Sequence, residues 1–518
     1  MYAPAKYVEK GLSWVANGLW YLVQPLYRIA PNRSFTPAWS DRPLLKSKEK
    51  FRPPLGVPRE TTSLCPTCTR EARQLITDNK ATPDLFIKDH SGEIPAQIIE
   101  RDGKILMVKD CAKHGHFEEV LSTDPAFFKK IESHFPGSDI PAQAAEGMHD
   151  HGSSALRYGR GAILNIDLTN RCNMMCDPCF TNANEVGFVH ELEWDEIKTI
   201  LDRAAQQKPH RQMSIQFTGG EPTLAKHFLK AVAYATELGF KSVQAATNGV
   251  EFAKDPEFCR KAARAGLRYV YLQFDGVGNA ANQHRHVPNL FDVKLRAIEN
   301  LHASGVDIVP VSTIINGVNN EQVGRIVDFV LDNPKKISFI SFQPISFTGR
   351  DEEISDERRT AQRYTMADLA HDIKRQTGLG EPLRDWFPIS LAGVFSDWVD
   401  VMHGSAAEWG HLNCACHPDC GCGMAVMVDK ETKERTPVSA FLDFPTFVKD
   451  MLVVNDAARG RFLSVLGLAL SLLRNYDPFE APPRMRITDL LQKFDKAAGA
   501  TKRDYGKVGK VRSMADVE

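Results

Sequence analysis

The sequence predicts an α/β protein organised around a partial (β/α)6 barrel of the TIM type. Between residues 161 and 345, six apolar, strand-like runs alternate with amphipathic helical segments, which is the pattern of a parallel sheet covered by helices. Six strands are too few for a closed eight-stranded barrel, so we expect an open one. Ten of the eleven cysteines fall into three tight groups, which predict metal centres before, within and after this barrel.

The bulk composition is that of a soluble globular protein. The chain has 518 residues, of which 43% are hydrophobic and 25% charged, and this length suits about three domains. The formal net charge of −1 leaves no global basic surface, so we expect no nucleic-acid partner. Grouped thiols without a recognisable secretory signal are typical of metal ligands in a reducing compartment, so we expect a cytoplasmic protein.

Composition and periodicity divide the chain into five parts. We expect an amphipathic helix and a proline-rich linker over 1–60, a small metal-binding module over 61–125, the barrel over 155–350, a cysteine-rich region over 351–500 and a disordered tail over 501–518.

Residues 11–27 carry no charge and predict a helix with an apolar stripe opposed by Ser13, Asn17 and Gln24. Aromatic residues such as Trp14 and Trp20 are of the kind that favours a membrane interface. Two interpretations stand: a helix packed on the protein's own core, or a peripheral anchor on the cytoplasmic membrane face. For a second apolar stretch, 462–473, we expect a core helix, because it is shorter than the ~20 residues that span a bilayer.

The first cysteine group predicts a metal site that staples the small module. Cys65-Pro-Thr-Cys68 and Cys111-Ala-Lys-His114 form two knuckle-like pairs, similar to a zinc ribbon or a rubredoxin-like site. Three thiolates and one imidazole suit tetrahedral zinc, whereas mononuclear iron usually has four sulfurs. His116 competes with His114 as the fourth ligand. Such a metal would stabilise the fold or, if it were iron, relay electrons.

The barrel elements follow from period and length. Strands are expected at 161–169, 213–218, 242–247, 269–275, 307–315 and 337–345, and helices at 194–207, 226–239, 255–266, 290–304 and 321–332. The turns after the strands carry the polar motifs, which places these motifs at the C-terminal mouth of the barrel. Cys259 falls in a helix and is expected to be a buried structural thiol.

The second cysteine group follows the first barrel strand as Cys172-Asn-Met-Met-Cys176-Asp-Pro-Cys179. Three close thiolates can hold three corners of a [4Fe-4S] cluster and leave the fourth iron open to a small molecule. A structural zinc site normally has four protein ligands, and this group offers three. Disulfide bonds are rare in a reducing compartment. We therefore assign Cys172, Cys176 and Cys179 to a cluster. Phe180 follows the last cysteine directly.

The second barrel strand ends in Phe217-Thr-Gly219-Gly220-Glu221-Pro222. Glycines let backbone approach a ligand closely, and Glu221 can accept a charge-assisted hydrogen bond from an ammonium group. In isolation this run would be a turn and a helix start. At the end of the strand that follows the cysteine loop, it instead predicts a ligand site.

Together these two motifs resemble the radical S-adenosylmethionine (radical SAM) superfamily. The resemblance implies a [4Fe-4S] cluster and S-adenosylmethionine as cofactors, cleavage to a 5′-deoxyadenosyl radical, and abstraction of hydrogen from an unactivated C–H bond. It places Phe180 near the adenine and Glu221 at the methionine ammonium. It also implies S-adenosylmethionine contacts at Asn248, Gln273, Asp275 and Ser312, although Asn-Gly and Asp-Gly are common in plain turns. Beyond the cluster, no catalytic residue is assignable.

The third cysteine group is Cys414-Ala-Cys416-His-Pro-Asp-Cys420-Gly-Cys422. Four thiols in nine residues suit an auxiliary [4Fe-4S] cluster, with zinc as the alternative. Such a cluster could relay electrons, bind substrate or donate sulfur, and these roles stay open.

The order of the three groups resembles one branch of the superfamily, which includes tetraether lipid synthase and pterin methylases. Supporting segments are Tyr364-Thr-Met-Ala-Asp-Leu369, Asp385-Trp-Phe-Pro388 and Cys416-His-Pro-Asp-Cys420. A lipid synthase with two auxiliary clusters would need more late cysteines than the four present.

The resemblance and the apolar segments lead to two catalytic hypotheses for function, and a third comes from a different class. The first is C–C bond formation on membrane-lipid hydrocarbon chains, with peripheral membrane contact. The second is methylation of a pterin-like cofactor, and the third is a non-catalytic iron–sulfur relay or scaffold. The two catalytic hypotheses need a lipid or small-molecule substrate and an electron donor such as ferredoxin or flavodoxin.

Overall fold

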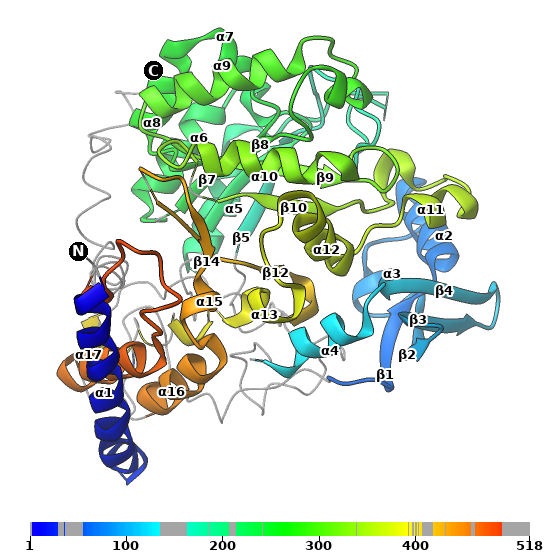
Figure 1. The fold of residues 1–518 in the computed structure, drawn as a ribbon. Helices are drawn as coiled ribbons and strands as arrows, with labels where there is room; N and C mark the ends of the chain where they lie inside the picture. Colours follow the sequence, from blue (N-terminus) through cyan, green and yellow to red (C-terminus); the bar gives the residue numbers. More distant parts are fainter. Residues whose placement is uncertain are drawn as a thin grey trace.

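The computed structural model describes most of the chain (Figure 1). The described residues are 3–29, 36, 55–134, 163–185, 187–206, 214–240, 242–337, 339–391, 393–395, 398, 401, 404–406, 418–429, 431–456 and 461–488. The expected tail at 501–518, most of the proline-rich linker, and Cys414 and Cys416 lie outside these residues.

The centre of the fold is an open, six-stranded parallel sheet in the order β10-β9-β8-β7-β6-β5. Its strands are β5 (Ile163–Thr169), β6 (Ser214–Gly219), β7 (Ser242–Thr247), β8 (Tyr269–Gln273), β9 (Asp307–Ile314) and β10 (Ser341–Pro344). Each strand pairs with the next along the chain, as successive βα units of one hand produce. The expected partial (β/α)6 barrel is confirmed, with β10 shorter than predicted.

Helices follow the strands and cover the sheet (Figure 1). They are α5 (Trp194–Gln206), α6 (Phe228–Glu237), α7 (Val250–Lys254), α8 (Pro256–Ala265), α9 (Leu290–Ala303) and α10 (Val323–Asp332). Their apolar faces and the strands form one core, in which Cys259 is fully buried, as expected for a structural thiol. Its Sγ lies 3.3 Å from the carbonyl oxygen of Phe252.

A separate four-stranded antiparallel sheet forms the N-terminal module, drawn in blue and cyan in Figure 1. It contains β1 (Arg59–Leu64), β2 (Glu93–Arg101), β3 (Lys104–Cys111) and β4 (Gly115–Ser122), with α2 (Pro66–Thr77) and α3 (Asp84–Ile87) between β1 and β2. The strand-like runs at 95–100 and 104–108 in the sequence predict only the two middle strands, β2 and β3. After β4, α4 (Pro125–Ser133) leads toward the C-terminal region.

The C-terminal region is mainly helical and carries four short strands. Its elements are α11 (Asp356–Gln362), α12 (Met366–Thr377), α13 (Pro382–Asp385), β11 (Phe387–Pro388), β12 (Cys422–Gly423), β13 (Val426–Val428), β14 (Arg435–Pro437), α15 (Val438–Phe441), α16 (Phe444–Asp456) and α17 (Arg461–Asn475). The apolar stretch 462–473 lies in α17 and contributes to the second core, as predicted.

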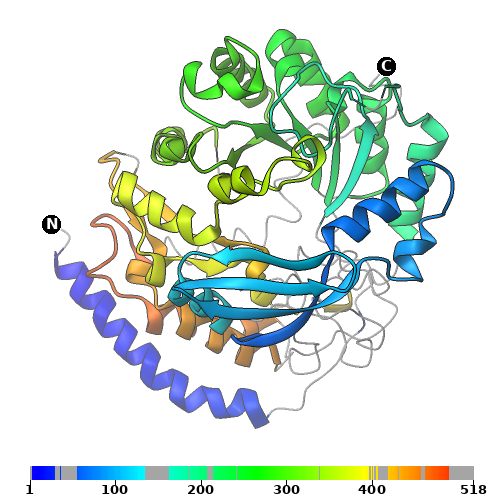
Figure 2. The same cartoon turned by 90° about the vertical axis from the view of Figure 1, so that its right-hand side faces the viewer.

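The N-terminal helix α1 (Ala3–Ile29) packs along α17 and α16 at the edge of the molecule (Figure 2). Trp20 and Tyr27 are buried in the second core, and the Ser13 hydroxyl donates to the carbonyl oxygen of Tyr476 at 3.2 Å. The prediction that Ser13 faces away from the core was wrong, because the packed face of α1 carries aromatic and small polar residues. The described residues contain no helix that combines the length and the hydropathy needed to cross a bilayer.

Candidate cluster and metal sites

The cysteine loop leaves the C-terminal end of β5, at the open edge of the parallel sheet. Cys172, Cys176 and Cys179 are each half-buried. Burial, with smaller contributions from the charges of Glu221, Cys176 and Cys179, raises the pKa of the Cys172 thiol to about 11. Three soft thiols that interact on one loop fit the donor set of an iron–sulfur cluster.

Two side chains hold the backbone of this loop. Asn184 accepts from the N–H of Cys172 at 2.8 Å and donates to its carbonyl oxygen at 3.0 Å. Arg350, from the segment after β10, donates to the carbonyl oxygens of Cys176 and Ala183. Gly349 makes this approach possible: a Cβ there would lie 2.4 Å from the carbonyl oxygen of Phe180. The loop is therefore shaped by both edges of the sheet.

The Gly219-Gly220-Glu221 loop packs against the cysteine loop through backbone hydrogen bonds. Gly220 N–H donates to Thr169 O at 2.7 Å, and Glu221 N–H donates to Arg171 O at 2.8 Å. A Cβ on Gly219 would lie 2.2 Å from Thr169 O, and one on Gly220 would lie 2.3 Å from Arg171 O. We expected the glycines to admit a ligand. In the structure they admit the neighbouring loop, which fixes the two motifs against each other.

The Glu221 carboxylate is buried and joins this loop to the end of β7. Oε1 accepts from the backbone N–H and the hydroxyl of Thr223 and from the Thr247 hydroxyl at 2.7 Å, while Oε2 accepts from Asn248 N–H at 2.8 Å. Burial raises the pKa of Glu221. Pro222, the next residue, begins a short 3-10 turn and is also buried.

A buried charged cluster lies beneath the cysteine loop. Asp275 accepts from Arg285 Nε at 2.5 Å and lies 3.2 Å from His284 Nε2. Burial alone would raise the pKa of Asp275. The Arg285 charge and these hydrogen bonds nevertheless hold this pKa below its usual range. Arg285 also donates at 3.0 Å to the carbonyl oxygen of Pro178, and its charge acts on the Cys176 thiol. One guanidinium thus connects the end of β8 to the cysteine loop.

Lys294 of α9 lies under the same site and is fully buried. Its ammonium donates to the carbonyl oxygen of Asn248, and burial lowers the pKa of Lys294 to about 7. Asn248 donates to Asn173 Oδ1 at 2.6 Å and lies 3.8 Å from Cys172 Sγ. Lys294 therefore positions a residue that borders the cysteine loop.

The other residues expected at S-adenosylmethionine differ in accessibility. Phe180 is 70% exposed, and Gln273 is half-buried and donates to Asp275. Asp275 and Ser312 have no exposed surface, and the Ser312 hydroxyl donates to the carbonyl oxygen of Phe274. Direct ligand contact by Asp275 or Ser312 does not fit this geometry, because both side chains are turned into the protein and satisfied there.

In the N-terminal module, Cys65, Cys68, Cys111 and His114 place their ligand atoms within 4.8 Å of one another. The Sγ atoms of Cys65 and Cys68 lie 3.4 and 3.3 Å from His114 Nδ1, and Cys68 Sγ lies 3.8 Å from Cys111 Sγ. A tetrahedron with metal–sulfur bonds of about 2.3 Å has edges of about 3.7 Å, so the donors fit zinc. A backbone hydrogen bond from Lys113 lowers the pKa of Cys111 to about 6, which favours the thiolate.

The two candidate histidines of this module have different neighbours. His114 Nε2 lies 3.3 Å from Glu71 Oε1, the outer-shell carboxylate that metal-binding imidazoles commonly have. His116 instead lies between Asp110 at 2.8 Å and Glu118 at 2.9 Å on the exposed side of the sheet. The structure thus brings His114, and not His116, to the three thiols.

The late cysteine group is described only in part, since Cys414 and Cys416 lie outside the described residues. Cys420 is exposed and Cys422 is half-buried in β12, which pairs with β11. Burial raises the pKa of Cys422 to about 12. Asp419 forms an ion pair with Arg59 at 3.3 Å, so this group lies against the N-terminal module.

Sequence motifs had pointed to the cysteines and to Glu221 but not to the residues that hold them. Asn184, Arg285, Lys294 and Arg350 stand in no recognisable motif. One signal was available: Lys294 interrupts the apolar face of a predicted core helix, where a lysine needs a buried acceptor.

Comparisons with known proteins agree with this geometry. A family model described as the radical SAM superfamily matches residues 166–330, and one described as the HMPTM N-terminal zinc ribbon domain matches residues 57–123. A protein of Methanocaldococcus jannaschii named 7,8-dihydro-6-hydroxymethylpterin dimethyltransferase is 30% identical over 456 residues, which cover 86% of this chain and 83% of that protein.

Two further similarities are limited to part of the chain. A Methanosarcina barkeri protein named Fe-coproporphyrin III synthase is 30% identical over 42% of this chain and 56% of its own length. A solved structure titled "Native anSMEcpe with bound AdoMet" aligns with a TM-score of 0.29 and 20% identity over 35% of this chain and 50% of that chain. On its two family matches and the M. jannaschii relative, this chain belongs to the radical SAM superfamily and is an enzyme of that superfamily with an N-terminal zinc ribbon.

Proposed function

We propose that this enzyme takes a hydrogen atom from an unactivated C–H bond, using S-adenosylmethionine bound at a cluster on Cys172, Cys176 and Cys179. The observation that supports this most is the backbone pairing of the cysteine loop with Gly220 and Glu221. Bound there, the cluster and S-adenosylmethionine would supply the radical, and the protein would orient the substrate and exclude water. The electron would come from a small donor protein such as ferredoxin or flavodoxin.

We assign ligand roles by remaining hydrogen-bond capacity and exposure. The Glu221 carboxylate is buried, but its Oε2 accepts one hydrogen bond within the protein and can accept another from an ammonium. Phe180, Asn248 and Gln273 are the remaining candidates for contact with S-adenosylmethionine, whereas Asp275 acts through Arg285. We further propose zinc on Cys65, Cys68, Cys111 and His114, and an auxiliary cluster on Cys414, Cys416, Cys420 and Cys422.

The first candidate substrate is a pterin-like compound, which the enzyme would methylate. The support is the M. jannaschii relative, whose similarity covers most of both chains and whose name specifies a pterin. Other relatives are named for a porphyrin and for GTP, so the shared barrel serves several substrates and does not by itself decide among them. A non-catalytic relay has no support, since the chain is a radical SAM enzyme.

The second candidate substrate is a lipid hydrocarbon chain, reached from the cytoplasmic face of a membrane. The support is the outer side of α1, where large apolar side chains are uncovered. Trp14 is 74% exposed, Leu22 72% and Ile29 78%. Monomeric soluble proteins rarely expose a continuous apolar surface of this length.

Between residues 7 and 27 of α1, side chains of similar type recur every seven residues. Each such set of three residues forms a row along one side of the helix. The outer rows, in order around the helix, are Tyr7/Trp14/Tyr21, Gly11/Gly18/Pro25, Val8/Val15/Leu22 and Leu12/Leu19/Leu26. These rows cover about half of the circumference and contain no charge. A polar row, Lys10/Asn17/Gln24, lies next to the aromatic row.

The order polar, aromatic, aliphatic matches the gradient from water through the headgroups to the acyl chains. A coiled coil with a second copy would bury a narrower seam and keep charged residues beside it, but the flanking rows here are aromatic or leucine. We therefore propose that α1 lies in the plane of a membrane with its outer rows inserted.

The chemistry is tested with anaerobically reconstituted, reduced protein. We expect 5′-deoxyadenosine from the full chain and none from Cys172→Ala, and a supplied reduced pterin should raise the yield of 5′-deoxyadenosine. If only lipid extract raises 5′-deoxyadenosine, the pterin assignment fails. If no substrate yields 5′-deoxyadenosine from the loaded full chain, the proposed reaction itself fails.

The membrane contact is tested by flotation with phosphatidylglycerol–phosphatidylethanolamine vesicles. Leu19→Glu/Leu26→Glu should abolish flotation, whereas Asn17→Glu/Gln24→Glu adds the same charge on the polar row and should leave it intact. Deleting residues 1–35 is a poorer test, because Trp20 belongs to the core. Failure of the unmodified protein to float, together with a dimer that Leu19→Glu disrupts, would instead identify a second copy as the partner.

A further inference from the structure

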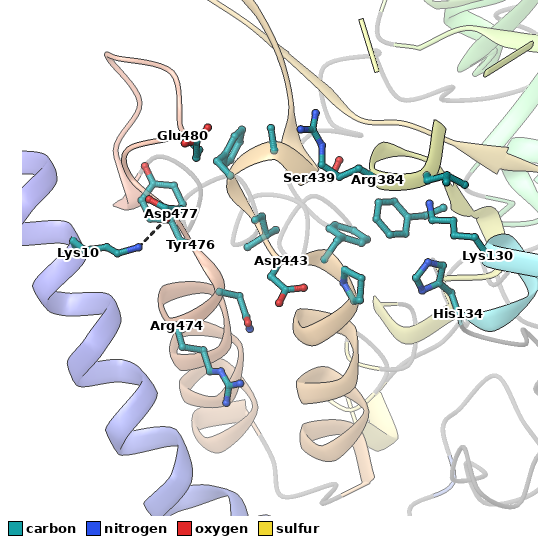
Figure 3. A pocket seen from close by; sticks show the side chains of 18 residues that line it. Lys10, Lys130, His134, Arg384, Ser439, Asp443, Arg474, Tyr476, Asp477 and Glu480 are labelled. Atoms are coloured by element: carbon teal, nitrogen blue, oxygen red, sulfur yellow. Dashed lines mark hydrogen bonds and ion pairs between the residues drawn. The ribbon is translucent and has the colours of Figure 1, made fainter. Parts of the chain in front are cut away.

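A cavity of about 630 Å³ lies between α1, α4, β11, α15 and the start of α16 (Figure 3). Its volume is within the range of small-molecule sites. Charged side chains line both ends: Lys10, Arg474, Asp477 and Glu480 lie at one end, and Lys130 and His134 at the other (Figure 3).

The cations at the first end have acidic partners. Lys10 pairs with Asp477 at 2.7 Å, and Arg474 Nε lies 3.4 Å from Asp450. In the middle, the Asp443 carboxylate accepts from the backbone N–H and the hydroxyl of Thr446 and so caps α16. These groups leave little unbalanced positive charge in that half of the cavity.

Lys130 of α4 and His134, the residue that follows this helix, form no such close ion pair among the described residues, although the charges of Cys422 and Asp385 act on Lys130 from a distance. The Lys130 ammonium lies 4.3 Å from the centre of the Phe387 ring and donates to the carbonyl oxygen of Trp386. No carboxylate of the described residues forms an ion pair with it. The His134 ring lies 5.2 Å from the same Phe387 ring, and its buried Nε2 has no hydrogen-bond partner. Buried polar atoms of this kind normally have one.

The electrostatics of this end favour an anion. Burial lowers the pKa of Lys130 to about 8 and that of His134 to about 4, so the imidazole is neutral and can donate from one nitrogen. The positive charges of Lys130 and Lys449 both act on His134. Arg384 adds no free charge, because it pairs with Asp385 at 2.7 Å.

We propose that Lys130 and His134 form a binding site for a phosphate group at this end of the cavity. The ammonium would pair with one oxygen, and His134 Nε2 would donate to another. The phosphate could belong to a soluble metabolite or to a lipid headgroup that enters beside α1.

The place of the site in the fold gives it a role. Phe387 belongs to β11, which pairs with the strand that carries Cys422, and Lys10 at the far end belongs to α1. A phosphate held at Lys130 would anchor a ligand between the membrane-facing helix and the late cysteine group. The site is independent of whether a pterin or a lipid is the substrate.

Isothermal titration of the full-length, metal-loaded protein tests this site with three probes: inorganic phosphate, sn-glycerol 3-phosphate and monomeric dihexanoyl phosphatidylglycerol. Loss of a charge-assisted hydrogen bond should weaken binding about tenfold to a hundredfold in Lys130→Met. His134→Phe should also weaken it, whereas Lys130→Arg should retain most of the affinity. Lys129→Met is the matched control, because Lys129 is exposed and pairs with Glu100.

The probes also separate the two sources. Binding of the lipid alone identifies a headgroup, and binding of the two soluble phosphates identifies a metabolite. The proposal is overturned if no probe binds the unmodified protein, or if Lys130→Met binds as tightly as Lys129→Met. Thermal unfolding of each variant verifies that the compared proteins are folded.

Discussion

Arg285 Nε donates to Asp275 Oδ2 at 2.5 Å, and the same guanidinium also donates to the carbonyl oxygen of Pro178 in the cysteine loop. Both side chains are almost fully buried. Since Arg285→Met removes the guanidinium that pairs with a buried carboxylate, the variant should lower the free energy of unfolding by about 3–5 kcal/mol. Urea unfolding measures the change, and Asp275→Asn/Arg285→Met should recover part of the loss. A double variant no more stable than Arg285→Met would show that the pair is not coupled.

Gly220 should tolerate no side chain, because a Cβ there would lie 2.3 Å from the carbonyl oxygen of Arg171. In Gly220→Ala the loop must move and lose two backbone hydrogen bonds, so we expect S-adenosylmethionine to bind about tenfold more weakly. Equilibrium dialysis of the reconstituted protein measures this, with iron content unchanged. Gly18→Ala is the control, since nothing lies within 4 Å of a Cβ there. Unchanged affinity for S-adenosylmethionine in Gly220→Ala would show that this loop does not contribute to binding.

Binding of the zinc proposed for the N-terminal module should depend on His114 and not on His116. His114→Ala removes a donor from the group of four, so purified protein should lose its zinc, and β1–β4 should become sensitive to protease. His116→Ala should keep one zinc, because its ring pairs with Asp110 and Glu118 instead. Metal analysis and limited proteolysis are the measurements. Zinc loss in His116→Ala alone would reverse the ligand assignment.

Because of His134, the free energy of unfolding should depend on pH in the acidic range. Burial lowers the pKa of His134 to about 4, against about 6.5 in an unfolded chain. Between these values the unfolded chain binds a proton that the folded chain does not, so the free energy of unfolding falls as pH drops from 6.5 to 4. We expect a loss of about 1–2 kcal/mol, reduced by partial solvent exposure.

His134→Phe should flatten this dependence, which denaturant unfolding at pH 4, 5 and 6.5 would show. The same measurement on His302→Gln, at an exposed position of α9, serves as the control. An unchanged slope in His134→Phe would assign the acid sensitivity to other groups.

The barrel could be predicted because each of its strands is a continuous apolar run, buried by helices of regular period. The ribbon strands β1 and β4 could not be, because their faces are half-exposed and carry charged residues such as Arg59 and Glu118. In α1 the helix was evident, but both sides of it are rich in apolar residues. Only packing shows that Trp20 faces the core and Leu22 faces outward.

For the site, local spacing was sufficient to find Cys172, Cys176, Cys179 and Glu221. The side chains that hold these residues come from distant segments, and their contacts depend on closure of the fold. For Ser312, which lies inside β9, the resemblance implied a contact with S-adenosylmethionine, but its hydroxyl donates to the carbonyl oxygen of Phe274 within the sheet.

The contact between Arg350 and the cysteine loop has a consequence for the order of assembly. Arg350 follows Cys176 by 174 residues, and its segment leaves the last strand of the sheet. During synthesis, the ribbon donors are complete once residue 114 has emerged, so zinc can load early. The cysteine loop can acquire its contacts with Arg350 only after the sixth strand has been made, so we expect cluster insertion to come late in the biogenesis of this enzyme.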